Sequence, residues 1–172
     1  MSKAKLKKYL SALPKEQVID IILQLYESSK EANTWFEFYL EPNSKAELEK
    51  YKKAILSQFY RRNGAPKYPS FRECNKLITT FQKLIPDPNA IADLMLYYVE
   101  QGCSLTAMFG DYDEPFYTAL ENNFYKAVKF ISSNGLMSDF SSRMKKMIKS
   151  VEFCSWRFTD TLWNIYYEYA ED

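Results

Sequence analysis

The chain has 172 residues, 47% of them hydrophobic, and a formal net charge of +1, as is ordinary for a globular protein. This length suits one domain, which we expect to span residues 1–172, with a core that needs no metal or disulfide. The chain contains no histidine, which excludes Ser-His-Asp and Cys-His pairs and histidine-based zinc motifs. Its four glycines are too far apart for a phosphate-binding loop. These absences favour a protein without enzymatic activity or cofactor, although carboxylate or lysine catalysis stays open.

Charge is distributed unevenly along the chain. Residues 1–86 hold 16 Lys+Arg and 9 Asp+Glu, whereas residues 87–172 hold 7 and 13. One interpretation is a basic half that complements an acidic half of the same molecule. The other is a basic face for an anionic partner.

The termini and cysteines indicate a cytoplasmic location. No apolar segment of signal-peptide length follows the basic N-terminus, and no apolar run approaches 18 residues. Cys74, Cys103 and Cys154 are widely spaced, without a zinc or disulfide pattern, and each is expected to be a small core residue. We therefore expect a cytoplasmic protein with no membrane partner.

Apolar residues recur at helical spacing from one end of the chain to the other. They predict about eight helices, around residues 6–13, 18–26, 48–59, 77–85, 91–98, 116–131, 140–151 and 158–169. Between the second and third of these helices, the aromatic segment 35–40 is expected to be buried on most sides.

Local signals predict where the helices begin and end. Ser44 follows a break at Glu41-Pro42 and is a candidate N-cap, and Ser70 with Glu73 forms a capping box. Pro14 is expected at the first position of a helix, and Asp87 with Pro88 at the N-cap and first position of another, after a stop at Pro86. Gly102 is expected to end a helix, which leaves residues 103–115 as the longest irregular segment.

These elements predict an all-α fold. The helices pair in antiparallel hairpins of about 30–40 residues, the size typical of helical repeats. We find no repeat with matching residues, so a compact irregular bundle and a short right-handed α-superhelix both stay open.

The segment 109–115 concentrates three carboxylates, Asp111, Asp113 and Glu114. Clustered oxygens of this kind are typical ligands of Ca²⁺ or Mg²⁺, so the loop is a candidate cation or small-ligand site. The alternative is helix capping, with Asp113 or Glu114 at the N-cap and Pro115 in the first turn.

Two basic groups are candidates for binding nucleic acid. The first lies in the basic half and contains Lys52, Arg61, Arg62 and Lys67, together with the N-terminal lysines Lys3 and Lys7. The second is the run Arg143, Lys145, Lys146 and Lys149. Either group could contact phosphates, and either could be an ordinary solvated surface.

Large aromatic residues are candidates for binding a protein partner. Trp156 and Trp163 stand seven residues apart, and Tyr166 follows within one helical turn. If this stretch is helical, the three rings share a face, which could anchor a partner or simply belong to the core. Trp35, in the aromatic segment, is a fourth candidate.

Several stretches resemble a family of small uncharacterised bacterial all-helical proteins that carry a domain-of-unknown-function label. They are Pro14-Lys15-Glu16-Gln17-Val18-Ile19, Phe36-Glu37-Phe38-Tyr39-Leu40, Tyr98-Val99-Glu100-Gln101-Gly102 and Gly110-Asp111-Tyr112-Asp113-Glu114-Pro115-Phe116-Tyr117. The resemblance covers nearly the whole chain and implies an intact helical domain. It implies no activity, cofactor or catalytic residue.

Surplus aromatic residues and missing catalytic types favour a protein-interaction module that binds an unknown protein partner or a second copy of itself. Nucleic-acid binding through the basic half is one alternative. Binding of a small ligand or cation by the 109–115 loop is the other.

Overall fold

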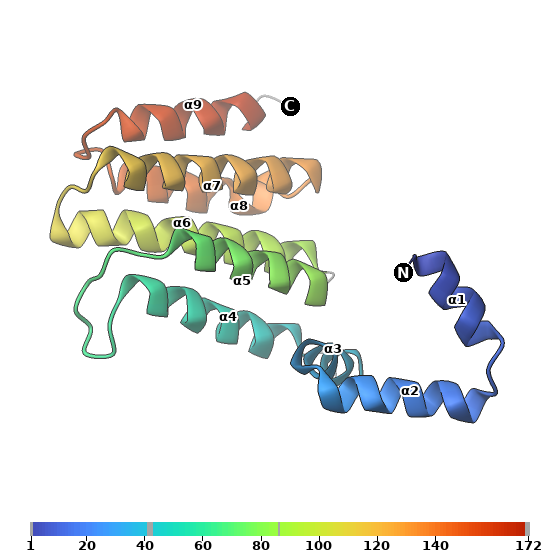
Figure 1. Ribbon diagram of the computed structural model, residues 1–172. Helices are drawn as coiled ribbons and strands as arrows, with labels where there is room; N and C mark the ends of the chain where they lie inside the picture. Colours follow the sequence, from blue (N-terminus) through green and yellow to red (C-terminus); the bar gives the residue numbers. More distant parts are fainter. Residues whose placement is uncertain (1, 41–42, 86, 171–172) are drawn as a thin grey trace. The chain divides into compact units, whose positions relative to one another are not determined.

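The structure is a computed structural model that describes residues 2–40, 43–85 and 87–170. Over these residues the chain forms nine helices and no strand, with one isolated β-bridge between Tyr60 and Pro66 (Figure 1). The prediction of an all-α protein is confirmed. The chain divides into two compact units, Met1–Asn43 and Ser44–Asp172, and each unit is described by itself. The expected single domain stays a prediction.

The N-terminal unit contains three helices, α1 (Lys3–Ser11), α2 (Lys15–Ser28) and α3 (Lys30–Leu40). The Ser2 side chain caps α1 by accepting a hydrogen bond from the Lys5 amide. Pro14 is the N-cap of α2, one position before the expected one. Helices α2 and α3 pack against each other, with the rings of Tyr26 and Phe36 6.5 Å apart.

The expectation that the aromatic segment is buried is wrong. Residues 35–40 are part of α3, and Trp35, Tyr39 and Leu40 are 43%, 67% and 73% exposed. None of the described residues in α1, α2 or α3 is buried. A unit of this size has too few elements to cover apolar side chains that point in several directions.

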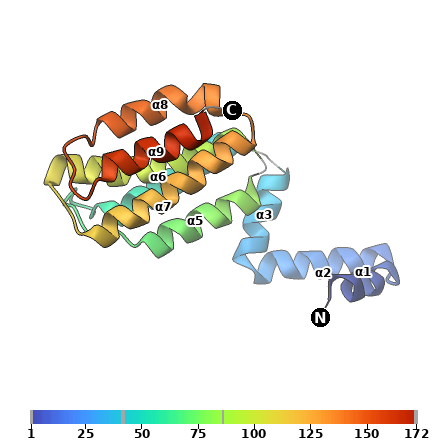
Figure 2. The same ribbon diagram turned by 90° about the horizontal axis from the view of Figure 1, so that it is seen from above.

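The C-terminal unit is a helical bundle built around one long helix. Its elements are α4 (Ser44–Phe59), α5 (Phe71–Leu84), α6 (Pro88–Phe109), α7 (Glu114–Ser133), α8 (Met137–Lys149) and α9 (Phe158–Ala170). Helix α6 contacts α4, α5, α7 and α8, while α7 also packs on α9 (Figures 1 and 2). The helices that pack together are one or two places apart in chain order, which fits both a compact irregular bundle and a short α-superhelix.

Three predicted caps of this unit are confirmed. The side chains of Ser70, Asp87 and Asp113 accept hydrogen bonds from backbone amides in the first turns of α5, α6 and α7. Ser44 was predicted to be the N-cap of α4 but is the first residue of this helix, which therefore begins one residue earlier than predicted. The breaks expected at Glu41-Pro42 and at Pro86 lie outside the described residues.

The prediction that Gly102 ends a helix is wrong, because α6 continues for seven residues to Phe109. Gly102 is buried where α7 crosses α6, and a Cβ there would lie 2.4 Å from Cδ2 of Leu120. This glycine therefore permits close packing of two helices. The irregular segment expected over 103–115 shrinks to residues 110–113.

The core of the C-terminal unit is rich in aromatic rings, among them Phe59, Phe81, Tyr98, Phe116 and Phe124, all fully buried. Cys74 and Cys103 are buried with them, as expected, and burial raises the pKa of the Cys74 thiol to about 12. Cys154 is only partly covered. In the described part of the chain, no helix is long and apolar enough to cross a membrane.

Candidate interaction surface

The N-terminal unit presents a large apolar surface. Ten of its large hydrophobic side chains are at least 36% exposed: Leu6, Tyr9, Ile19, Ile21, Ile22, Leu23, Leu25, Trp35, Tyr39 and Leu40. We call this set the N-terminal apolar surface. Together these side chains, spread over three helices, expose on the order of 1,000 Å². Exposed apolar area of this extent is unusual for a protein without a binding partner.

Helix α2 contributes the middle of this surface because it is apolar on more than one side. Ile19 and Leu23 are one turn apart and lie on one face, 44% and 52% exposed. Ile21 and Leu25 are also one turn apart, lie on a second face and are 36% and 50% exposed. A single neighbouring helix covers only one face, so packing of α3 on α2 leaves the other open.

Helix α3 adds a group of rings. Trp35 and Tyr39 stack one turn apart, with centroids 5.1 Å apart and an interplanar angle of 13°, and Phe36 meets Trp35 edge-on. Trp35 was the only residue of this surface among the predicted partner-binding residues. Exposed, pre-stacked rings add contact area at small cost in side-chain entropy.

Charges on the N-terminal unit are segregated by helix. Helix α1 carries four lysines, Lys3, Lys5, Lys7 and Lys8, and no acidic residue. Helices α2 and α3 carry five acidic residues and two lysines, a net charge of −3. None of these groups forms an ion pair with another described residue, although the Glu37 carboxylate accepts a hydrogen bond from the Tyr26 hydroxyl.

The other predicted aromatic residues do not form one face. Trp156 precedes α9 in a left-handed backbone conformation (φ 62°) and is 54% exposed. Trp163 lies on α9, is partly covered and stacks on Tyr167. Tyr166 is buried, with its hydroxyl 2.7 Å from that of Ser141. The shared face required a helix through Trp156, and α9 begins only at Phe158.

The three carboxylates of the acidic loop have separate contacts. Asp113 caps α7 and also accepts a hydrogen bond of 2.8 Å from the hydroxyl of Tyr68. Burial, followed by this contact with Asp113, raises the pKa of Tyr68 to about 12. Glu114 is the first residue of α7. Among the described residues, no group of three potential ligands is placed to hold a metal ion.

Asp111 ties two connections of the bundle together. Its carboxylate accepts hydrogen bonds from the side chains of Ser155, in the α8–α9 connection, and Tyr117, on α7. The hydrogen bond from Ser155, and then that from Tyr117, lowers the pKa of Asp111. Phe153 and Trp156, which flank Ser155, are both more than half exposed.

The predicted basic residues differ in how far they are available. Lys52 on α4 donates a 2.8 Å hydrogen bond to Asp93 of α6, so its charge is already paired. Arg61 and Arg62 are exposed in the α4–α5 connection, and Lys67 there is partly covered. In the second basic run, Arg143 points into the bundle.

Sequence analysis missed the ion-pair network around Arg143. The guanidinium of Arg143 on α8 lies 2.6 Å from Asp93 and binds both oxygens of Glu100 at 2.6 and 2.8 Å. Asp93 and Glu100 are two turns apart on α6 and thus on one face, while Arg143 adjoins the buried Met144. The spacing of Asp93 and Glu100, and the position of Arg143 next to a core residue, could have predicted this network from the sequence. The basic run around Arg143 suggested a solvated surface instead.

The described residues thus define an all-α protein, with a bundle locked by an inter-helix ion-pair network and a second helical unit whose apolar side chains are open. The chain matches the model of a family of unknown function, DUF6155, over residues 1–170, and it belongs to this family. A comparison with curated proteins and one with solved structures each found no match. The resemblance to a domain of unknown function is confirmed, while a bacterial source stays a prediction.

Proposed function

We propose that this protein is a non-enzymatic interaction protein that associates with a second copy of itself through the N-terminal apolar surface. The observation that carries the proposal is that three helices with ten large exposed apolar side chains bury none of their described residues. Fewer than about 45 residues rarely form a stable unit without further burial, so a partner that covers this surface would stabilise it.

The size of the surface supports a second copy as the partner. A standard protein interface takes about 800 Å² from each side, and the ten side chains of the N-terminal apolar surface, counted over all faces of the three helices, expose on the order of 1,000 Å². A two-fold dimer uses the same patch on both copies, so one surface of this size is sufficient.

The charges support the same partner. In a two-fold arrangement, the four lysines of α1 from one copy can face the acidic α2 and α3 of the other, and the reverse. Such complementarity sets the orientation of the two copies and speeds their encounter more than it adds affinity.

Paired substitutions on α2 test this proposal. The double variant Leu23→Gln, Leu25→Gln removes apolar area at exposed positions, so the helical content should stay intact while the dimer dissociates at least about tenfold more readily. Tyr167→Gln, on the exposed side of α9, is the matched control. Light scattering after size exclusion measures the mass. Equal masses for the double variant, the control and the parent chain would rule out this surface.

The alternatives remain predictions of lower rank. For nucleic-acid binding, Lys52 is less available because it is paired with Asp93, whereas Arg61 and Arg62 are exposed. A cation at the 109–115 loop would compete with the hydrogen bonds already made by Asp111 and Asp113. A cytoplasmic location belongs to the proposal as well.

A further inference from the structure

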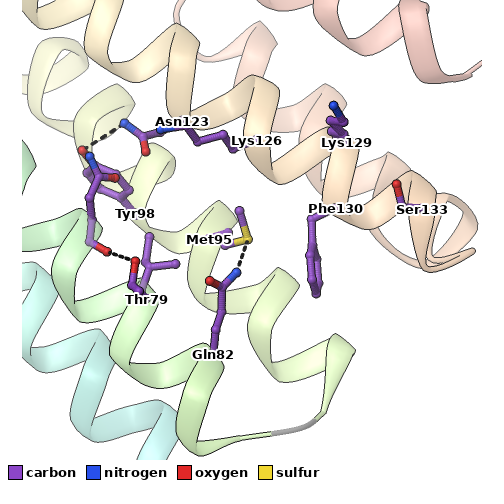
Figure 3. A pocket seen from close by; sticks show the side chains of 11 residues that line it. Thr79, Gln82, Met95, Tyr98, Asn123, Lys126, Lys129, Phe130 and Ser133 are labelled. Carbon is purple, nitrogen blue, oxygen red and sulfur yellow. Dashed lines mark hydrogen bonds between the residues drawn. The ribbon is translucent and has the colours of Figure 1, made fainter. Parts of the chain in front are cut away.

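A groove between α5, α6 and α7 of the bundle is distinct from the proposed association surface. Its volume is about 440 Å³, within the range of small-molecule sites. Side chains from all three helices line it, with Met95, Tyr98 and Phe130 among its apolar surfaces (Figure 3). The groove therefore has the size and apolar content of a site for a small organic molecule.

Two buried polar side chains form the floor of the groove. The amide nitrogen of Asn123, a residue 7% exposed, donates to the hydroxyl of Tyr98 at 3.4 Å (Figure 3) and to the carbonyl of Ala119 at 2.7 Å. Within the described part of the chain, every buried side-chain nitrogen or oxygen has a hydrogen-bond partner. Burial raises the pKa of Tyr98, which keeps this hydroxyl protonated. Because Tyr98 is fully buried, this pair shapes the floor, and a ligand would meet the more exposed groups around it.

A third polar side chain is held only weakly. The side-chain nitrogen of Gln82 on α5 lies 3.8 Å from the sulfur of Met95 (Figure 3). A thioether is a poor acceptor, so little is lost when this amide turns to a ligand oxygen. The groove thus offers an amide donor from α5, beside the lysines of α7.

The charge of the groove is positive. Lys126 and Lys129 line it, and no carboxylate does. The ammonium of Lys129 lies 5.8 Å from the ring of Tyr125, on its own helix, whereas Lys126 forms no ion pair with a described residue. Lys126 is therefore the cation most available to a ligand.

We propose that this groove binds a small organic anion. The anionic group, a phosphate monoester or a carboxylate, pairs with Lys126, and an oxygen of the ligand meets the Gln82 amide. Met95 and Phe130 contact the carbon skeleton. Cationic ligands are disfavoured because the groove has no group of opposite charge.

Titration of the isotope-labelled full chain, followed by NMR, tests the proposal. The probes are ribose 5-phosphate, citrate and uncharged ribose, each up to about 10 mM, which reaches weak millimolar affinities. We expect signals of Asn123, Gln82 and Lys126 to shift with at least one anion and not with ribose. Which anion acts distinguishes a phosphate site from a carboxylate site.

Three variants make the test specific. Lys126→Gln should weaken anion binding about tenfold, and Gln82→Leu should weaken it severalfold while keeping a side chain of similar size. Lys146→Gln, at an exposed lysine of α8, should leave binding unchanged. Groove signals that stay still with both anions would overturn the proposal, as would equal weakening by Lys146→Gln and Lys126→Gln.

Discussion

Arg143 shows how one side chain can hold three helices of the bundle together. It lies on α8, bridges Asp93 and Glu100 of α6, and shares Asp93 with Lys52 of α4. Charged pairs that are only a quarter to a third exposed are screened less than surface pairs. The network therefore fixes the register of α4, α6 and α8 more than it adds net stability.

Replacing Arg143 with alanine should destabilise the C-terminal unit. The change leaves two half-buried carboxylates without their shared cation, and we expect a loss of about 2 kcal/mol, reduced from a fully buried pair by partial solvent exposure. Urea unfolding followed by circular dichroism measures it. The control Lys146→Ala, on the exposed face of α8, should stay within about 0.5 kcal/mol of the parent. Equal stability of both variants would show that the network contributes nothing.

The same network should make stability depend on acid pH. Burial alone would raise the pKa of Asp93, but hydrogen bonds from Lys52 and Arg143 outweigh it, and the pKa is lowered. A carboxyl whose folded pKa is depressed stabilises the fold above its unfolded pKa of about 3.9, and this stabilisation is lost as pH falls through the folded pKa. Urea unfolding at pH 7 and pH 3 should show a smaller pH effect for Asp93→Asn than for the parent. An identical effect would contradict this assignment.

At the scale of elements, the Asp111 contacts anchor the α8–α9 connection to the start of α7. Replacing Asp111 with asparagine weakens its hydrogen bonds with Ser155 and Tyr117, so amide hydrogen exchange should speed up severalfold over residues 151–157. Mass spectrometry of exchanged peptides measures this change. Glu114→Gln, at the neighbouring exposed carboxylate, should leave exchange unchanged. Unchanged exchange in both variants would mean that the connection is held by other contacts.

Helix starts were predictable from sequence because capping is a local interaction. Ser70, Asp87 and Asp113 each bond an amide two or three residues ahead, which the residue types alone indicate. The end of α6 was not predictable in this way. Gly102 looks like a helix terminator, yet its role is set by Leu120 of α7, a contact that only the folded bundle reveals.

At the scale of the whole molecule, the sequence indicates which side chains need covering but not what covers them. The apolar residues of α2 have the same spacing as those of the core helices, and the aromatic segment 35–40 of α3 was expected to be buried on most sides. The structure separates them, because α4 to α9 bury their stripes against one another while α1 to α3 do not. Of the four aromatic partner-binding candidates, only Trp35 therefore belongs to the proposed surface.

The mass of the unmodified full chain in solution tests the central claim most directly. Sedimentation velocity from about 1 to 200 µM spans the affinities expected of an interface of standard size. We predict a dimer that dissociates to the 20.3 kDa chain on dilution. It should dissociate more readily at high salt, because in the proposed dimer the lysines of α1 face the acidic α2 and α3 of the other copy. A single species of monomer mass throughout this range would contradict the account, since the N-terminal apolar surface would then not join two copies.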